Sequence, residues 1–287
     1  MPVAVVTDTT HYLPAELLAE RGIQQVSLYV TRGDAAERES SIQDYDAFYG
    51  GLRDQSDLPS TSQPSVGDFL AVYEPLVASG HDVVSIHLAG GISGTVESAR
   101  QAAAIAVGDS GRTIEVIDSR MACGAQGLAV LAAAAGAASG DLTAAVARAN
   151  EAIASLQRTF IFAVDTLEYL RRGGRIGTAQ AWLGGALKIK PILTLDGEIT
   201  PIERVRTSKR SFERMVKVAE ELAASGRDGW CVQHIQARAE AERLAAAAQE
   251  IIGTAPRFIS EVGPVIGSHV GPGLLGIGGI PSSLLDD

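Results

Sequence analysis

Short apolar runs and longer amphipathic segments alternate along the first half of the chain. The runs rich in β-branched residues, which are typical of buried strands, are residues 3–6, 26–30, 82–88 and 113–117. The segments with apolar residues at helical spacing are residues 15–21, 40–53, 66–79, 95–105, 125–138 and 142–156. This alternation predicts a doubly wound α/β/α domain, in which helices cover both faces of a parallel sheet.

The pattern changes after residue 158. The strands expected there are residues 160–164, 192–200, 230–235 and, as the last strand, 258–262, with amphipathic helices at 209–224 and 237–252. The dipeptide Asp196-Gly197 is typical of a two-residue hairpin turn. Residues 263–273 are so rich in glycine that we expect a loop.

These patterns predict an α/β protein of two domains. Residues 1–158 form a domain with a parallel sheet. Residues 159–287 form a smaller α/β domain, whose hairpin implies a mixed sheet.

A glycine-rich turn joins the strand at residues 82–88 to the helix that begins at Thr95. Gly90, Gly91, Ser93 and Gly94 leave the backbone open to a ligand, and a helix start offers unpaired N–H groups to an anion. Three other interpretations compete with an anion site. A dinucleotide-binding turn fits poorly because the glycines lack its spacing, and a nucleophile elbow fits poorly because Thr95 replaces its last glycine. Ser93 could also be a helix cap only.

Composition excludes several classes of function. The chain has 287 residues and a net charge of −10, which argues against nucleic acid as a partner. Cys123 and Cys231 stand alone, so we expect reduced thiols, no metal site and no cofactor. The first residues lead directly into a strand, and no apolar run reaches membrane-spanning length. We therefore expect a cytoplasmic protein without stable membrane insertion.

Five separated stretches together resemble the DegV family of bacterial fatty-acid-binding proteins. They are residues 7–10 (TDTT), 61–65 (TSQPS), 93–95 (SGT), 170–176 (LRRGGRI) and 263–273 (GPVIGSHVGPG). The resemblance implies two α/β domains with an apolar ligand tunnel between them. It also implies that the protein binds one long-chain fatty acid and performs no chemistry unaided. A separate ATP-dependent fatty acid kinase would receive the carboxylate and make an acyl-phosphate for phospholipid metabolism.

The resemblance also assigns roles to particular residues. Thr61, Ser93 and His269 match the hydroxyls and the histidine that surround the ligand carboxylate, and we expect Ser62, Gly94 and Arg175 to bind the ligand beside them. The residues that match the family's kinase-binding basic surface are Arg204 and Arg206, which could equally form a solvated strand edge. Arg171, Arg172 and Arg175 could instead pair with acids such as Glu168.

Two other functions remain open from the residues alone. Ser93, an aspartate and His269 follow the chain order of an α/β-hydrolase triad, although no orienting acid is evident. The Ser93 turn could also serve a sensor of small anions.

Overall fold

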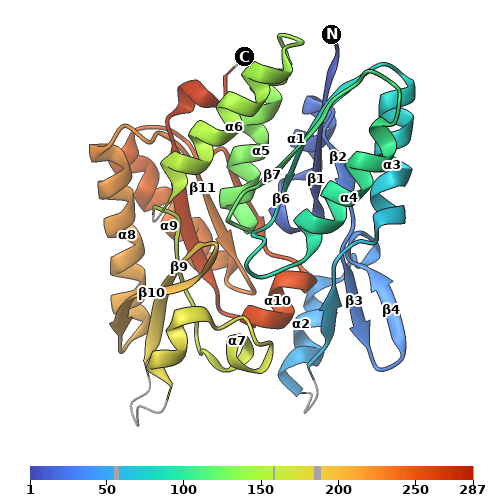
Figure 1. Cartoon of the computed structure of the whole chain (residues 1–287). Coiled ribbons are helices and arrows are strands. Elements are labelled where there is room, and N and C mark those ends of the chain that lie inside the picture. The colour runs from blue at the N-terminus through green and yellow to red at the C-terminus, as the bar shows by residue number, and fades with distance from the viewer. Residues whose placement is uncertain (55–57, 158, 184–188, 287) are drawn as a thin grey trace.

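The first half of the chain builds a four-stranded parallel sheet in the order β2–β1–β6–β7 (Figure 1). The computed structural model describes residues 1–54, 58–157, 159–183 and 189–286. The strands are β1 (Val3–Asp8), β2 (Gln24–Val26), β6 (Asp82–His87) and β7 (Ile114–Asp118). All three pairings are parallel, as the alternation of strands and helices predicts.

Helices pack on both faces of this sheet. The helices of this half are α1 (Ala15–Arg21), α2 (Tyr45–Asp54), α3 (Val66–Ala78), α4 (Thr95–Val107), α5 (Cys123–Ala137) and α6 (Leu142–Leu156). Helices α3 and α4 bury Phe69, Tyr73 and Ala99 against one face, whereas α5 and α6 pack against the other. The first residues of two helices follow from the local sequence. Ser65 and Asp68 form a capping box at the start of α3, and Asp141 caps α6.

The second half builds a six-stranded mixed sheet in the order β10–β9–β8–β13–β11–β12. The strands are β8 (Ile161–Ala163), β9 (Lys190–Asp196), β10 (Glu198–Val205), β11 (Gly229–His234), β12 (Phe258–Glu261) and β13 (Leu275–Ile280). Within this sheet β11 and β12 pair in parallel, whereas the other neighbouring strands pair antiparallel. The helices are α7 (Glu168–Arg172), α8 (Ser208–Ala224), α9 (Arg238–Ile252) and α10 (Pro264–Val270). Helices α8 and α9 cover one face through the apolar core that contains Met215 and Leu244.

Helix α5 lies between the two sheets (Figure 1). Every residue from Gly124 to Gly136 is buried, and the same core contains Val84 of the first sheet and Cys231 of the second. A helix that is apolar on all sides is stable only when it is covered all round. The alanine-rich sequence of α5 therefore joins the two halves. The boundary predicted at residue 158 stays a prediction, because that residue lies outside the described ones.

The strand predicted at residues 26–30 is wrong. Strand β2 ends at Val26, and a new strand, β3 (Tyr29–Arg32), pairs antiparallel with β4 (Ala35–Arg38) and β5 (Ser60–Ser62) in a separate sheet. The chain changes sheets at Ser27 and Leu28, where Leu28 O accepts a hydrogen bond from Glu39 N. Both residues are buried, so hydrophobicity does not mark the break.

Two predictions near the C-terminal end are also wrong. The expected loop at 263–273 contains helix α10, and β12 is followed by a further strand, β13, in the middle of the mixed sheet. In both elements glycine makes room for an aromatic neighbour. A Cβ on Gly267 would collide with Tyr49, and a Cβ on Gly278 would collide with Phe160. These glycines allow close packing and do not mark turns.

Candidate functional site

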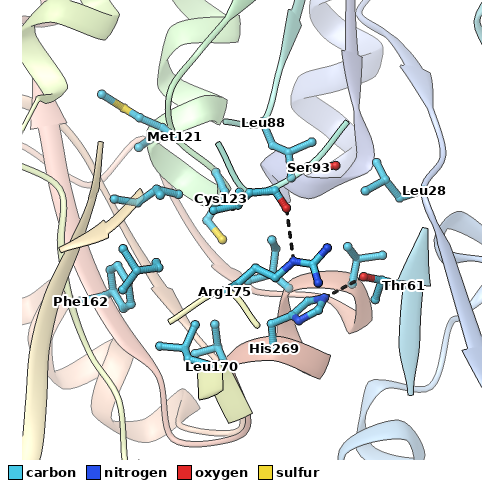
Figure 2. Close-up of a pocket in the computed structure, with 18 of the residues that line it drawn as sticks. Leu28, Thr61, Leu88, Ser93, Met121, Cys123, Phe162, Leu170, Arg175 and His269 are labelled. Carbon is cyan, nitrogen blue, oxygen red and sulfur yellow. Dashed lines mark hydrogen bonds between the residues drawn. The ribbon is translucent and has the colours of Figure 1, made fainter. Parts of the chain in front are cut away.

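A mostly apolar cavity lies where the two halves meet (Figure 2). Its volume is about 210 Å³, whereas one water needs roughly 10–15 Å³ measured in the same way. The cavity is therefore large enough for an organic ligand. Its walls come from the first half through β5, the loop after β6 and the start of α5, and from the second half through the mixed sheet, α7 and α10.

Polar side chains gather toward one side of this cavity. Thr61, Ser93 and His269, which the resemblance assigns to the ligand carboxylate, all line it, and in Figure 2 they lie away from Met121 and Phe162. Thr61 Oγ1 is 2.7 Å from His269 Nε2, a hydrogen bond between β5 and α10. Three residues that are far apart in the sequence thus face one space.

His269 is held in its neutral form. Burial, together with the nearby positive charge of Arg175, lowers the pKa of its imidazole to about 4. Its Nδ1 atom is buried and has no hydrogen-bond partner among the residues that the structure describes. Gly173 lies directly against this atom, because a Cβ there would collide with Nδ1. Near pH 7 the neutral ring can therefore form one hydrogen bond with Thr61, either as donor or as acceptor.

The Ser93 turn offers fewer free donors than the sequence predicts. The N–H groups of Ile92 and Ser93 both donate to Ala89 O, and Gly90 N donates to Asp118 Oδ1. The Ser93 hydroxyl accepts from Thr95 N and lies 2.9 Å from Thr95 Oγ1. Gly94 and not Ser93 is therefore the N-cap residue of α4, although the Ser93 hydroxyl holds Thr95 N and also faces the cavity.

The remaining candidate ligand residues lie around the same polar end. Ser62 and Arg175 line the cavity. Arg175 Nε donates to Ile92 O at 3.4 Å, and Arg175 Nη1 donates to Gly173 O, so this side chain spans the two halves (Figure 2). Gly94 lies beside Gln63, whose side chain a Cβ at Gly94 would overlap. Arg171 instead forms the expected ion pair with Glu168.

Arg204 and Arg206 lie outside the cavity lining, on and just after β10. Both are exposed. The Arg204 guanidinium stacks over the ring of Trp182, with 4.5 Å between its central carbon and the ring centroid. This arrangement is compatible with a surface for a partner and with a solvated strand edge.

The apolar wall was not predicted residue by residue. It includes Leu28, Met121, Cys123, Phe160 and Phe162, which come from three different parts of the chain. Burial raises the pKa of the Cys123 thiol far above its usual range, and the charge of Glu39 adds to this effect. Cys123 is therefore an apolar wall residue and not a nucleophile.

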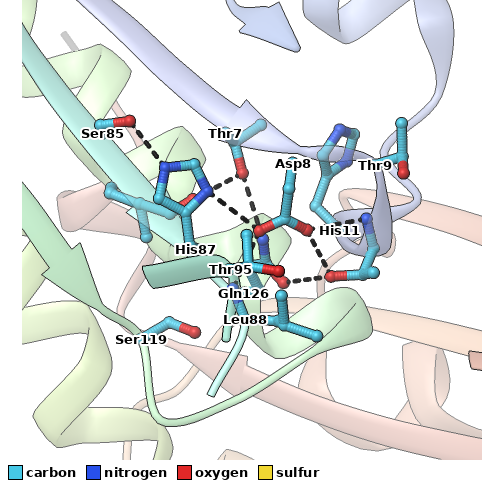
Figure 3. Close-up of polar contacts among 12 residues, drawn as sticks. Thr7, Asp8, Thr9, His11, Ser85, His87, Leu88, Thr95, Ser119 and Gln126 are labelled. Atoms are coloured by element: carbon cyan, nitrogen blue, oxygen red, sulfur yellow. Dashed lines mark hydrogen bonds and ion pairs between the residues drawn. The ribbon is translucent and has the colours of Figure 1, made fainter. Parts of the chain in front are cut away.

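A buried polar cluster lies at the ends of β1 and β6 (Figure 3). His87 Nδ1 is 3.0 Å from Asp8 Oδ2, and its Nε2 is 2.7 Å from Ser85 Oγ. Burial alone would raise the pKa of Asp8, but hydrogen bonds and charge from His87, with further bonds from Thr10 and Leu88, hold it below its usual value. The order Ser–His–Asp resembles a hydrolase triad, yet Ser85 is 0% exposed and donates or accepts with Tyr73. This cluster supports the sheet and cannot meet a substrate.

Ser93 and His269 are not arranged as a nucleophile and its base. Ser93 is hydrogen-bonded to Thr95 and His269 to Thr61, so the two side chains do not bond to each other. Among residues 1–54, 58–157, 159–183 and 189–286, no group of three or more His, Cys, Asp or Glu could hold a metal ion. No helix in the described part of the chain is long and apolar enough to cross a membrane.

These features define an α/β protein with a parallel sheet, a mixed sheet and a mostly apolar cavity whose polar side chains gather at one end. The chain belongs to the DegV family: residues 2–282 match the family model, whose description is "Uncharacterised protein, DegV family". It is 39% identical to the DegV domain-containing protein SCO2569 of Streptomyces coelicolor, over 96% of this chain and 97% of that one. It is 38% identical to Protein DegV of Bacillus subtilis, over 96% and 98%.

Solved structures of relatives have the same fold. The crystal structure of Bacillus subtilis DegV, described as a fatty acid binding protein, matches with a TM-score of 0.84 and 36% identity, over 96% of this chain and 98% of that one. A Thermus thermophilus DegV family protein, described for its fatty acid binding, matches with a TM-score of 0.83 and 34% identity, over 96% and 98%.

Proposed function

We propose that this protein binds a long-chain fatty acid, with the carboxylate near Thr61, Ser93 and His269 and the alkyl tail along the apolar wall. The observation that carries the proposal is the polarity of the cavity, which has hydroxyls, an imidazole and Arg175 at one end and mostly apolar side chains elsewhere. Gln233 also lines it, but its amide is hydrogen-bonded to Gly124 N and Ser260 Oγ. The fatty acid binding described for the Bacillus subtilis and Thermus thermophilus relatives supports the same ligand.

The tautomer of His269 decides whether the Thr61 hydroxyl can donate a hydrogen bond to the ligand carboxylate. If His269 Nε2–H donates to Thr61 Oγ1, the buried Nδ1 carries only a lone pair. In the other tautomer Nδ1–H would be a buried donor without an acceptor, which costs more. The first tautomer leaves the Thr61 hydroxyl proton free for the ligand.

The tail and the head of the ligand have different tasks. Each buried CH₂ contributes about 0.8 kcal/mol, so a long alkyl chain supplies most of the affinity. A hydrogen bond to a charged carboxylate contributes roughly 1.5–3 kcal/mol, which is enough to fix its orientation. Ordering the flexible chain offsets part of this gain.

We further propose that the bound carboxylate is presented to a separate ATP-dependent fatty acid kinase, which forms the acyl-phosphate. Arg204 and Arg206 would belong to the surface that meets this partner. The protein itself is then a non-catalytic carrier, a role that suits the separate hydrogen-bond partners of Ser93 and His269.

Mass spectrometry of lipid released from denatured purified protein tests the ligand. We expect a long-chain fatty acid, and we expect palmitate or oleate to raise the melting temperature of delipidated protein. Trp182 packs against the core that borders the cavity, so its fluorescence should also respond. If no lipid is released and neither acid changes either signal, the fatty-acid proposal is wrong; a bound small anion would favour a sensor.

The variant Ser93→Ala tests the polar end. Loss of one hydroxyl donor should lower fatty-acid affinity about tenfold while the protein stays folded. Ser110→Ala is the matched control, because its exposed hydroxyl also accepts from a backbone N–H two residues later. Equal affinity in both variants would leave Ser93 with only a local structural role at the start of α4.

A further inference from the structure

Glu39 is a buried carboxylate that the proposed ligand site does not use directly. Its exposed fraction is 2%, and it follows β4 in the first half of the chain. Three groups donate hydrogen bonds to it: Thr9 Oγ1 at 2.5 Å, Tyr12 OH at 2.8 Å and Val265 N at 2.8 Å. A buried carboxylate is retained only where such donors replace its water.

These bonds fix the first turn of α10. Val265 N donates to Glu39, and Ile266 N donates to Tyr12 OH at 3.2 Å. Just before the helix, Tyr49 OH donates to Val262 O and Gly263 O. Gly263 permits this close approach, because a Cβ there would lie 3.0 Å from Glu39 Oε1 and 2.6 Å from the Tyr12 ring. The start of α10 is thus held by side chains of the first half.

The other side of the same short helix faces the cavity. Val265, Ile266, His269 and Val270 line it, and His269 bonds to Thr61. One turn of helix separates Val265 N, which Glu39 holds, from the imidazole at the polar end. A shift of the first turn would therefore move His269.

We infer that Glu39 is a positioning residue that places His269 for the ligand carboxylate by holding the first turn of α10. This inference rests on the proposed function for its consequence in binding, but not for the structural link itself. Removal of the acceptor would leave the Thr9, Tyr12 and Val265 donors without a partner, and α10 would lose its place.

The ionisation of Glu39 should modulate this hold. Burial raises the pKa of Glu39 to about 7, although hydrogen bonds from Thr9, Val265 and Tyr12 oppose the rise. The titratable groups that interact with it are Asp8, Tyr12, Tyr45, Tyr49 and Cys123. A carboxyl whose pKa is higher when covered favours the covered state on protonation. Helix α10 should therefore be held more firmly at pH 6 than at pH 8.

Hydrogen–deuterium exchange of the 264–270 segment, corrected for intrinsic rates, tests the link without any ligand. In the wild type, protection of this segment should fall about tenfold from pH 6 to pH 8. Glu39→Gln keeps an acceptor and removes the charge, so its protection should not change with pH. Glu39→Leu removes the acceptor at similar size and should lose protection at both pH values.

Fatty-acid titration of the same variants tests the consequence for binding. Palmitate affinity should fall about tenfold in Glu39→Leu and be restored in Glu39→Gln. Glu37→Gln, on the exposed end of β4, is the matched control and should change nothing. If Glu39→Leu does not fold, Tyr12→Phe, which removes one of the three donors, should give the same change to a smaller extent.

The outcomes separate the two ideas. Wild-type protection and affinity in Glu39→Leu, or the same pH profile in Glu39→Gln as in the wild type, would overturn the role of Glu39 while fatty-acid binding stands. Absence of palmitate binding in the wild type would overturn the proposed function, and the exchange pattern would still decide whether Glu39 holds α10.

Discussion

The position of the His269 side chain depends on a glycine from another element. Gly173, just after α7, has φ −76°, a backbone conformation that any residue adopts. Its lack of a side chain therefore matters only for space. A Cβ would collide with His269 Nδ1 and lie 3.2 Å from Tyr169 O. The two glycines of the sequence RRGGR thus have different roles. Gly173 makes room for His269, whereas Gly174 has φ +69° and no described atom within 4 Å of an added Cβ.

Gly173→Ala should displace His269 and lower fatty-acid affinity about tenfold, because the hydrogen bond to Thr61 is lost. Isothermal titration with palmitate measures the change. Gly174→Ala is the neighbouring control: it strains the backbone and should cost about 1 kcal/mol of stability without moving His269. Wild-type affinity in Gly173→Ala would show that the imidazole can relocate without cost.

At the scale of single residues, the sequence identifies the polar end better than its surroundings. Thr61, Ser93 and His269 follow from a match to family motifs, and all three line the cavity. Gly173 and the apolar wall could not be predicted, because their roles come from contacts between distant segments. Gly94 belongs to the same motif as Ser93, yet its small size admits Gln63.

At the scale of elements, glycine is the main source of wrong predictions. The sequence locates α1, α6 and the β9–β10 hairpin, because caps mark the helix ends and Asp196-Gly197 marks the turn. The predicted two-residue turn is wrong, however, since Asp196 pairs with Glu198 and only Gly197 lies between the strands. It fails for α10 and β13, where glycines face Tyr49 and Phe160. A glycine that makes room for an aromatic ring has the same letter as a glycine in a turn, and only tertiary packing distinguishes them.

The tip of the β9–β10 hairpin docks on the turn that carries Ser93. Gly197 N donates to Arg120 O at 2.7 Å, and Arg120 Nε donates to Asp196 Oδ1 at 2.9 Å. A Cβ on Gly91 would collide with the Gly197 carbonyl oxygen. Leu195 and Ile199, on either side of the tip, line the cavity. The hairpin thus closes part of the ligand site against the first half.

Gly91→Ala should push this tip away and speed fatty-acid dissociation several-fold, as measured by displacement of a fluorescent fatty acid. Arg120→Ala should have a smaller effect, because Arg120 is 49% exposed and such ion pairs contribute about 1 kcal/mol or less. Gly50→Ala, with no atom within 4 Å of the added Cβ, is the control. A larger effect of Arg120→Ala than of Gly91→Ala would contradict this ranking.

At the scale of the whole molecule, the two sheets are joined through α5, and the start of that helix lines the cavity. Strand β7 ends before the change in strand pattern at residue 158 and β8 begins after it, while the domain boundary itself stays a prediction. Sequence periodicity cannot show that α5 belongs to the core of both halves. That property follows from how the two sheets stack.

The stability of the whole protein should decline between pH 7 and pH 5. Burial lowers the pKa of His11 and of His269 to about 4, so each favours the folded state above pH 6.5 and loses that contribution as the pH falls. Burial also lowers the pKa of His234, which acts in the same direction. Glu39, whose pKa burial raises to about 7, has the opposite effect and gains stability on acidification.

The combined loss of stability from the three buried histidines exceeds the gain from Glu39. The free energy of unfolding of ligand-free protein should therefore be about 1–2 kcal/mol lower at pH 5 than at pH 7. Urea denaturation at the two pH values measures the difference. Glu39→Gln removes the opposing contribution, so its decline should be steeper, whereas His11→Gln should decline less than the wild type. A wild-type protein that is more stable at pH 5 would show that the buried histidines are not neutral in the folded protein. A Glu39→Gln variant with a shallower decline would instead show that the pKa of Glu39 is not raised.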